Sequence, residues 1–314
     1  MIFKTEFKVQ PFSDIITYQD KVCFLGSCFA ENISSYFERL RFQTQKNPFG
    51  ILYHPTAIQK IIETALNTEV LDDQVFNHDG VWSHFIAHSA LSSPDKEKLK
   101  SNLSNAKKQT KTTLKESDFI FISLGTAWVY KHIEKDLIVN NCHKLPQKQF
   151  EKYLMTLSEV NESIAQIIQN IRQINSQAKL IFTLSPVRHL KDGFVENQRS
   201  KSTLHLAIQN VIEQHKKTYY FPSYELLLDD LRDYRYYKDD FVHPNALALK
   251  YIWSKFKESF FNKNTLKLID EVENINKRLN HRAFNPDSKA SMAFKDKTEN
   301  MIKALKTKHP EIVF

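Results

Sequence analysis

The chain has 314 residues, of which 41% are hydrophobic and 12% aromatic, enough apolar material for one large or two small α/β domains. Five glycines and ten prolines exclude a collagen-like or linker-dominated chain. The net charge of +8 includes +5 from residues 255–314, where basic residues are interleaved with acidic ones. Such interleaving is typical of a solvated helical face, so we expect no nucleic-acid partner.

The start of the chain has no uninterrupted apolar stretch after a basic segment, and no run of about 20 apolar residues follows it. We therefore expect a cytoplasmic protein without a membrane partner. The three cysteines, Cys23, Cys28 and Cys142, are too few for a disulfide framework and favour a reducing compartment. The sequence leaves the oligomeric state open.

Short apolar runs followed by helical periods indicate that strands and helices alternate. The first run, residues 22–25, ends at Gly26 and Ser27 and passes into a helical pattern. A second strand is predicted at residues 119–122. The segment between them, residues 41–116, does not follow this rhythm, and we expect it to form an insertion that shapes the site.

The second half of the chain continues the alternation. Apolar spacing over residues 150–174 predicts a long crossover helix, and strands are predicted at 179–184 and 218–221. Runs that are apolar on both faces belong to a sheet covered on both sides. We therefore predict a three-layer α/β/α sandwich with a mostly parallel sheet over residues 1–260. Residues 261–314 are expected to form a helical appendage packed on the same domain.

Candidate catalytic groups lie after the first strand and near the last core helix. Ser27 lies at a strand end and a helix start, where ligands bind in open α/β sheets and unpaired N–H groups can stabilise an oxyanion. A serine in this position can also be a plain helix cap. Asp240 and His243 have the spacing D-x-x-H in a polar loop, which lets a carboxylate orient an imidazole toward a hydroxyl. Together, Ser27, His243 and Asp240 form a candidate catalytic triad.

The string FLGSCFAEN at residues 24–32 resembles the name-giving motif of the GSCFA family, an SGNH/GDSL-like group seen mainly in Bacteroidetes-type bacteria. The resemblance spans roughly residues 20–260 and implies an SGNH-hydrolase-like fold with flavodoxin-like strand order. It also implies a serine esterase that needs neither cofactor nor metal. Further segments that resemble the family are NPFGILYHP (47–55), LGTAWVY (124–130), NCHK (141–144), SPVRHLKDG (185–193) and RDYRYYKDDFVHP (232–244).

The resemblance places the SGNH nucleophile at Ser27, although Gly-Ser-Cys replaces the usual Gly-Asp-Ser and puts the serine directly after the glycine. If the third position is the true equivalent, Cys28 is the nucleophile, as a thiol at a helix start. We favour Ser27, because a free cysteine is most often a small buried apolar residue.

The asparagine that donates to the oxyanion in SGNH enzymes is missing, because GTAW at residues 125–128 stands where G-x-N-D is expected. An active enzyme needs a substitute, since one such donor is worth about 3–4 kcal/mol. Asn47 precedes a proline, so an ordinary Asn-Pro turn is its alternative role. The candidate donors are Asn47, Gly50, Gly125, Thr126 and Asn141.

His84 and His88 lie four residues apart, and with His78, Cys142 and His143 they could be taken for a metal site. The pattern His-x-x-x-His lacks the intervening glutamate of the metalloprotease motif, and there is no CxxC pair. We therefore expect no metal and assign His88 to contact with the substrate.

Arg188 follows the strand at 179–184 and is expected to reach the same face, where its guanidinium could hold a substrate group. The alternative is a salt bridge with an acid at residues 229–240. Since SGNH relatives frequently act on acetylated carbohydrates, the predicted function is removal of an acyl (acetyl) group from a carbohydrate or related small molecule. An O-acyltransferase with the same site and a non-catalytic glycan-binding protein are the alternatives.

Overall fold

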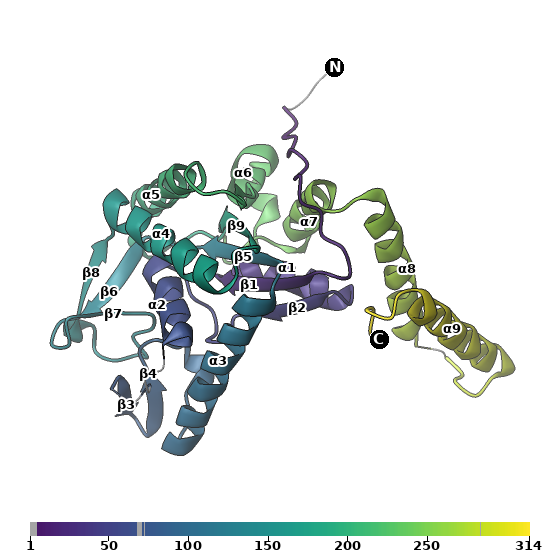
Figure 1. Ribbon diagram of the computed structural model, residues 1–314, viewed down its shortest axis with the longest axis horizontal. Coiled ribbons are helices and arrows are strands. Elements are labelled where there is room, and N and C mark those ends of the chain that lie inside the picture. Colours follow the sequence, from purple (N-terminus) through teal and green to yellow (C-terminus); the bar gives the residue numbers. More distant parts are fainter. Residues whose placement is uncertain (1–4, 68–70, 72, 283) are drawn as a thin grey trace.

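The computed structural model describes residues 5–67, 71, 73–282 and 284–314. Its centre is a five-stranded parallel sheet in the order β10-β9-β5-β1-β2 (Figure 1). Counted along the chain this order is flavodoxin-like, and the predicted fold class is confirmed. The strands of this sheet are β1 (Lys21–Gly26), β2 (Gln43–Lys46), β5 (Phe119–Leu124), β9 (Lys179–Leu184) and β10 (Thr218–Tyr220).

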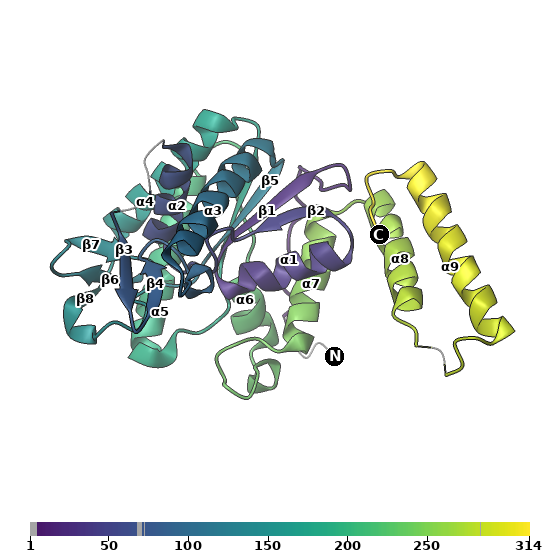
Figure 2. The same cartoon turned by 90° about the horizontal axis from the view of Figure 1, so that it is seen from below.

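Both faces of the sheet are buried, because successive strand side chains point to opposite sides. In β1, Cys23 and Leu25 pack with helices α2 to α5, whereas Val22 and Phe24 pack with α1 and α7. Two views of the ribbon show the resulting layers (Figure 1, Figure 2). The helices of the domain are α1 (Cys28–Arg39), α2 (Pro55–Leu66), α3 (Lys96–Glu116), α4 (Leu157–Ile174), α5 (Phe194–Ile212), the short α6 (Ser223–Glu225) and α7 (Ala246–Phe260).

Much of residues 41–116 belongs to the layers themselves, which differs from the expected insertion. The segment supplies the edge strand β2 and the covering helices α2 and α3. The sequence hid β2 because its four residues, QTQK, are all polar, as an edge strand permits. The hairpin of β3 (Val75–His78) and β4 (Val81–His84) lies outside the layers, with Asp79 and Gly80 at positive φ in its turn.

Residues 150–154 also differ from the prediction, which assigned them to the following helix. They form β8 (Phe150–Leu154), which joins β6 (Trp128–His132) and β7 (Leu137–Val139) in a small antiparallel sheet of order β7-β6-β8. Helix α4 begins only at Leu157, after a capping box between Thr156 and Glu159. Apolar residues at spacings of three and four also suit a short strand, so periodicity alone did not separate the two elements.

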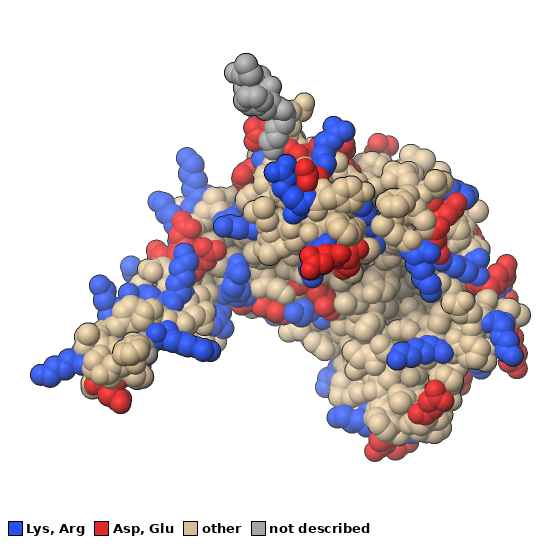
Figure 3. Space-filling model, turned by 180° about the vertical axis from the view of Figure 1, so that it is seen from behind, with Lys and Arg blue, Asp and Glu red and all other residues tan. Residues whose placement is uncertain are grey.

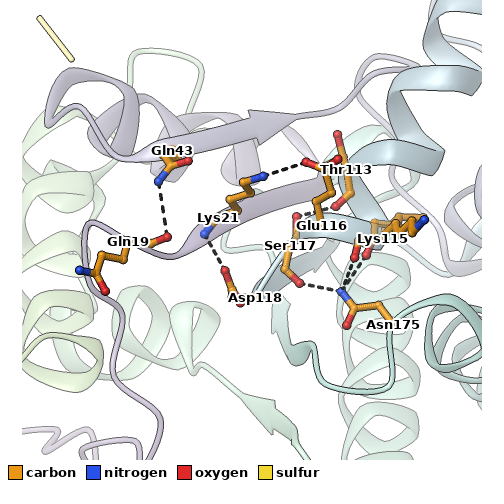
Figure 4. A network of polar contacts seen from close by, with 10 residues as sticks. Gln19, Lys21, Gln43, Thr113, Lys115, Glu116, Ser117, Asp118 and Asn175 are labelled. Atoms are coloured by element: carbon orange, nitrogen blue, oxygen red, sulfur yellow. Dashed lines mark hydrogen bonds and ion pairs between the residues drawn. The ribbon is translucent and has the colours of Figure 1, made fainter. Parts of the chain in front are cut away.

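Polar side chains hold together the amino-terminal ends of the central strands (Figure 4). The carboxylate of Asp118 accepts from the backbone N–H of Lys21 at 2.9 Å, and Lys21 Nζ pairs with Glu116 at 2.8 Å. The side-chain amide of Asn175 donates to three carbonyl oxygens at the end of α3, at 2.8, 3.0 and 3.2 Å. The amino-terminal ends of these strands and the end of α3 are therefore held together by hydrogen bonds.

Helices α8 (Lys263–Leu279) and α9 (Lys289–Lys308) lie side by side and extend away from the sheet (Figure 1, Figure 2). Ile269, Val272 and Ile275 of α8 are buried in the core that α1 and α7 share. Lys and Arg side chains gather along this helix pair in the space-filling view (Figure 3). Among the described residues, no helix is both long and apolar enough to span a membrane.

Candidate active site

The first strand-to-helix junction depends on a glycine. Gly26 ends β1 at φ +116°, and a Cβ at this position would lie 2.2 Å from the carbonyl oxygen of Ser123 in β5. Ser27 follows as the N-cap of α1, and its hydroxyl accepts from the Phe29 N–H at 3.3 Å. The same hydroxyl bonds the Ser123 hydroxyl at 2.8 Å, and Ser27 is 0% exposed. Ser27 thus caps the helix and joins β1 to β5 in the interior.

Cys28, the alternative nucleophile of the sequence analysis, is the first residue of α1 and is partly exposed. The pKa of its thiol is raised overall, chiefly by burial and also by the charge of Glu31, although the N–H groups of Cys28 and Phe29 and the charge of Lys201 act to lower it. A helix start and a nearby cation are the two features that stabilise a thiolate. At this junction the thiol, not the hydroxyl, is the side chain open to a ligand.

Lys201 of α5 is the buried cation beside Cys28, and the sequence analysis did not identify it. Its side chain is 1% exposed, and Nζ donates at 2.7 Å to the carbonyl oxygens of Gly125 and Ser185, which follow β5 and β9. Burial lowers the pKa of Lys201 to about 7, while the Cys28 charge acts to raise it. A lysine on the core-facing stripe of α5, three residues before Leu204, was the available sequence signal.

The predicted Asp240–His243 pair forms in the loop before α7. Asp240 Oδ2 lies 2.7 Å from His243 Nδ1, and Asp240 Oδ1 accepts from the N–H groups of Val242 and His243 at 2.8 and 2.9 Å. These backbone hydrogen bonds, with that of the His243 ring, lower the pKa of Asp240 to about 2. The carboxylate fixes the proton on Nδ1 and leaves Nε2 as the free acceptor.

His189 packs against the segment before α2, since its ring meets the Tyr53 ring edge to face with centroids 5.5 Å apart. The backbone N–H of its neighbour Arg188 donates to the Val242 carbonyl at 3.1 Å, which ties the segment after β9 to the loop of the pair. Burial, then the charges of Lys201 and His243, lower the pKa of His189 to about 3. Among the described residues, no hydrogen bond joins His243 directly to Ser27 or Cys28.

The NPFG loop is held as a turn, and its candidate donors are engaged. Asn47 Oδ1 accepts from the Gly26 N–H at 2.8 Å, and Asn47 Nδ2 donates to Glu31 at 3.3 Å. The Gly50 N–H donates to the Asn47 carbonyl at 2.7 Å. Gly50 has φ +81°, and a Cβ there would meet the His88 side chain at 2.3 Å. This loop therefore supports the end of β1, and neither donor points at an open space.

Of the remaining predicted donors, Gly125 and Thr126 are also engaged. The N–H groups of Gly125 and Thr126 both donate to the Tyr53 carbonyl, at 2.7 and 3.1 Å. The Thr126 hydroxyl lies 3.1 Å from that of Ser200. Asn141 Oδ1 accepts from the His143 N–H at 2.8 Å. Hydrogen bonds to neighbouring parts of the fold thus determine the conformation of these residues.

His88 and Arg188, the other predicted substrate contacts, have the following partners. His88 Nδ1 accepts from the Ala90 N–H at 3.2 Å and so caps a single helical turn. The Arg188 guanidinium stacks on the rings of Tyr237 and Tyr234, with its carbon 4.1 and 5.1 Å from their centroids, and Nη1 has no hydrogen-bond partner within the described part of the chain. No ion pair of Arg188 with an acid at 229–240 occurs among the described residues.

The histidines considered for a metal have other contacts. His84 Nδ1 accepts from the Ile86 N–H at 3.1 Å, and His143 Nε2 lies 3.0 Å from the His84 carbonyl oxygen. Within residues 5–67, 71, 73–282 and 284–314, no three His, Cys, Asp or Glu side chains come together as metal ligands do.

These features define a doubly wound α/β protein whose candidate site lies at the carboxyl edge of the sheet, around the first strand-to-helix junction. The chain belongs to the GSCFA family: the GSCFA family model matches residues 21–256, and the model of the GSCFA domain protein, C-terminal domain, matches residues 272–314. The family resemblance of the sequence is thereby confirmed.

Two solved structures are similar to part of the chain. One is a carbohydrate esterase family 3 from Talaromyces cellulolyticus, 12% identical, with a TM-score of 0.28 over 50% of this chain and 60% of the other. The other is a mutant acetyl esterase with acetate ion, 13% identical, with a TM-score of 0.30 over 52% of this chain and 66% of the other. The chain therefore covers less than two thirds of either esterase. No curated protein matches it in sequence.

Proposed function

We propose that the chain hydrolyses acyl esters through the Cys28 thiolate, with His243 as proton acceptor and donor and Asp240 as its orienting carboxylate. The observation that carries the proposal is the position of Cys28 at the start of α1 beside the fully buried Lys201. The proposal replaces the predicted Ser27 by Cys28, because the Ser27 hydroxyl is buried against Ser123. It keeps the predicted Asp240–His243 pair.

The proposed reaction has two halves. His243 Nε2 takes the Cys28 proton, the sulfur attacks the ester carbonyl, and the oxyanion collapses as the alcohol leaves with the proton from His243. A thioester on Cys28 remains. Water then gives a proton to His243 and attacks the thioester, and the acid leaves as the sulfur recovers its proton. The Cys28 N–H in the first turn of α1 is available to the oxyanion in both halves.

As substrate we propose an acetyl ester of a carbohydrate or a related small molecule, by analogy with the SGNH enzymes that the family resembles. An O-acyltransferase would share the first half and use a hydroxyl in place of water. A glycan-binding protein without turnover is the second candidate, and the engaged N–H groups of Gly50 and Gly125 favour it.

Acetate release from p-nitrophenyl acetate and from a peracetylated sugar tests the proposal. Wild-type protein should turn over and carry one acetyl group on Cys28 in a quenched sample, whereas Cys28→Ala should fall to the uncatalysed rate. Cys142→Ala is the matched control, since it removes another partly exposed thiol and should retain full turnover.

Four other outcomes would overturn the proposal in different ways. Full turnover by Cys28→Ala would remove the thiol from the reaction, and loss of turnover on Ser27→Ala with Cys28→Ala unaffected would restore the serine. Release that requires an added alcohol would indicate acyl transfer. Sugar binding without any release would support the binding protein.

A further inference from the structure

The proposed reaction lacks a side-chain donor for the oxyanion. The side-chain amide of Asn47 is bonded to Glu31, and the N–H groups of Gly50, Gly125 and Thr126 are bonded to carbonyl oxygens. A backbone N–H at the start of α1 can supply one donor. A second donor therefore has to come from a side chain that no other group engages.

The His189 imidazole is such a group. Its Nε2 is buried and has no hydrogen-bond partner within the described part of the chain. The ring meets the Tyr53 ring edge to face, with centroids 5.5 Å apart. A Cβ on Gly125 would lie 3.0 Å from His189 Nε2. The glycine of GTAW thus leaves room for the imidazole at the end of β5, where G-x-N-D would carry its asparagine.

The surroundings of His189 keep it neutral. Burial lowers its pKa to about 3, and a positive charge on Lys201 or His243 acts in the same direction. A neutral imidazole carries one N–H and so can donate a hydrogen bond without bringing a proton that the sulfur would take. The backbone is fixed too, since the His189 N–H donates to Asn197 Oδ1 at 2.8 Å.

We infer that His189 Nε2–H donates to the oxyanion of the acyl intermediate and takes the place of the missing SGNH asparagine. The inference rests on the proposed function, because it needs a tetrahedral centre built on Cys28. The donor is uncharged in the ground state and gains its partner only as negative charge develops, so it should affect kcat more than KM.

Two variants separate the donor from the shape of the ring. His189→Phe keeps the bulk and removes the N–H, whereas His189→Gln keeps an amide donor. We expect kcat of His189→Phe to fall by about 10²- to 10³-fold with KM within about twofold, and His189→Gln to recover about a tenth or more of the wild-type rate. His281→Phe, at the far end of α8, is the matched control.

A trifluoromethyl ketone gives a second readout, because a thiolate adds to it reversibly and forms the oxyanion without turnover. His189→Phe should weaken this inhibitor about as much as it lowers kcat, while a melting temperature equal to that of wild type shows that the variant has folded. A His189→Phe enzyme with kcat and inhibitor affinity within threefold of wild type would overturn the inference and leave the proposed function standing. Equal ester hydrolysis by wild type and Cys28→Ala would overturn both.

Discussion

The amino-terminal and carboxyl-terminal ends of the central parallel strands carry similar polar residues in different roles. They are called here the amino edge and the carboxyl edge of the sheet. At the amino-terminal ends of the strands, Asp118 and Asn175 hydrogen-bond backbone groups and Lys21 Nζ pairs with Glu116 (Figure 4). At the carboxyl edge, Lys201 is buried with a lowered pKa and His189 keeps an unpartnered nitrogen. A buried polar group without a hydrogen-bond partner lowers the stability of the fold. Such groups are therefore found most often at functional sites, where a ligand can be their partner.

We infer that the amino-terminal ends of the strands contribute stability, and we place the proposed reaction at their carboxyl-terminal ends. Substitutions at the two edges should therefore separate turnover from the free energy of unfolding. The following predictions are ordered by the size of the effect.

Asp240→Asn should give the largest loss. The amide cannot hold the proton on Nδ1 of His243 as the carboxylate does, so kcat for acetate release should fall by about 10²- to 10⁴-fold. The melting temperature should not change, because the pair is on the surface. Asp239→Asn, one residue earlier and equally exposed, is the control, and an equal loss in both variants would contradict the assigned role.

Lys201→Met should make the Cys28 thiolate harder to form. Without the buried cation the thiol pKa rises, and each unit lowers the thiolate fraction about tenfold at a pH below it. The iodoacetamide alkylation rate of Cys28, measured against pH, should shift to higher pH. Lys255→Met removes another buried lysine from the opposite face of the sheet and should leave the profile unchanged.

The same lysine predicts the sign of a stability change with pH. The pKa of Lys201 is about 7 in the folded chain and 10.5 for an ordinary lysine, so between these values the unfolded chain binds more protons. The free energy of unfolding of wild type should therefore rise as pH rises from 7 toward 10, relative to Lys201→Met. Urea unfolding of both proteins across this range measures the slope, and a falling difference would contradict the lowered pKa of Lys201.

Asn175→Ala should affect stability alone. It removes one amide that donates to three carbonyl oxygens of α3, so the free energy of unfolding should drop by about 2 kcal/mol. Turnover per folded molecule should match wild type. Lys21→Ala at the same edge breaks an exposed ion pair and should produce no measurable change in either quantity.

The sequence predicts the fold well where strands are apolar and poorly where they are not. Four of the five strands of the main sheet follow from apolar runs, whereas β2 is polar because it lies at the edge. The residues 150–154 satisfy helical spacing and still form a strand, since the choice depends on pairing with β6. Such pairing is a tertiary property that spacing does not contain.

Prediction of the candidate site from the sequence has the same limit, because it depends on individual tertiary hydrogen bonds. The D-x-x-H spacing predicts the Asp240–His243 pair because that contact is local. The use of the Gly125 N–H depends on the carbonyl of Tyr53, far away in the sequence. Lys201 carried a signal in its place on a core-facing stripe, but its partners are carbonyl oxygens from two other strand ends. Availability of a donor or a charge is decided by such distant neighbours.

Gly26 allows β1 and β5 to lie close together and thereby determines the position of the Cys28 sulfur. Any larger residue would collide with the Ser123 carbonyl and spread β1 from β5. The hydroxyl of Ser27, the next residue, also joins the two strands through its hydrogen bond with the Ser123 hydroxyl. In the Gly-Ser-Cys motif, the glycine and the serine thus join β1 to β5, and the cysteine is the partly exposed side chain. A homologue that kept the glycine and the serine but lost the cysteine would be expected to retain the fold without the proposed thiol nucleophile.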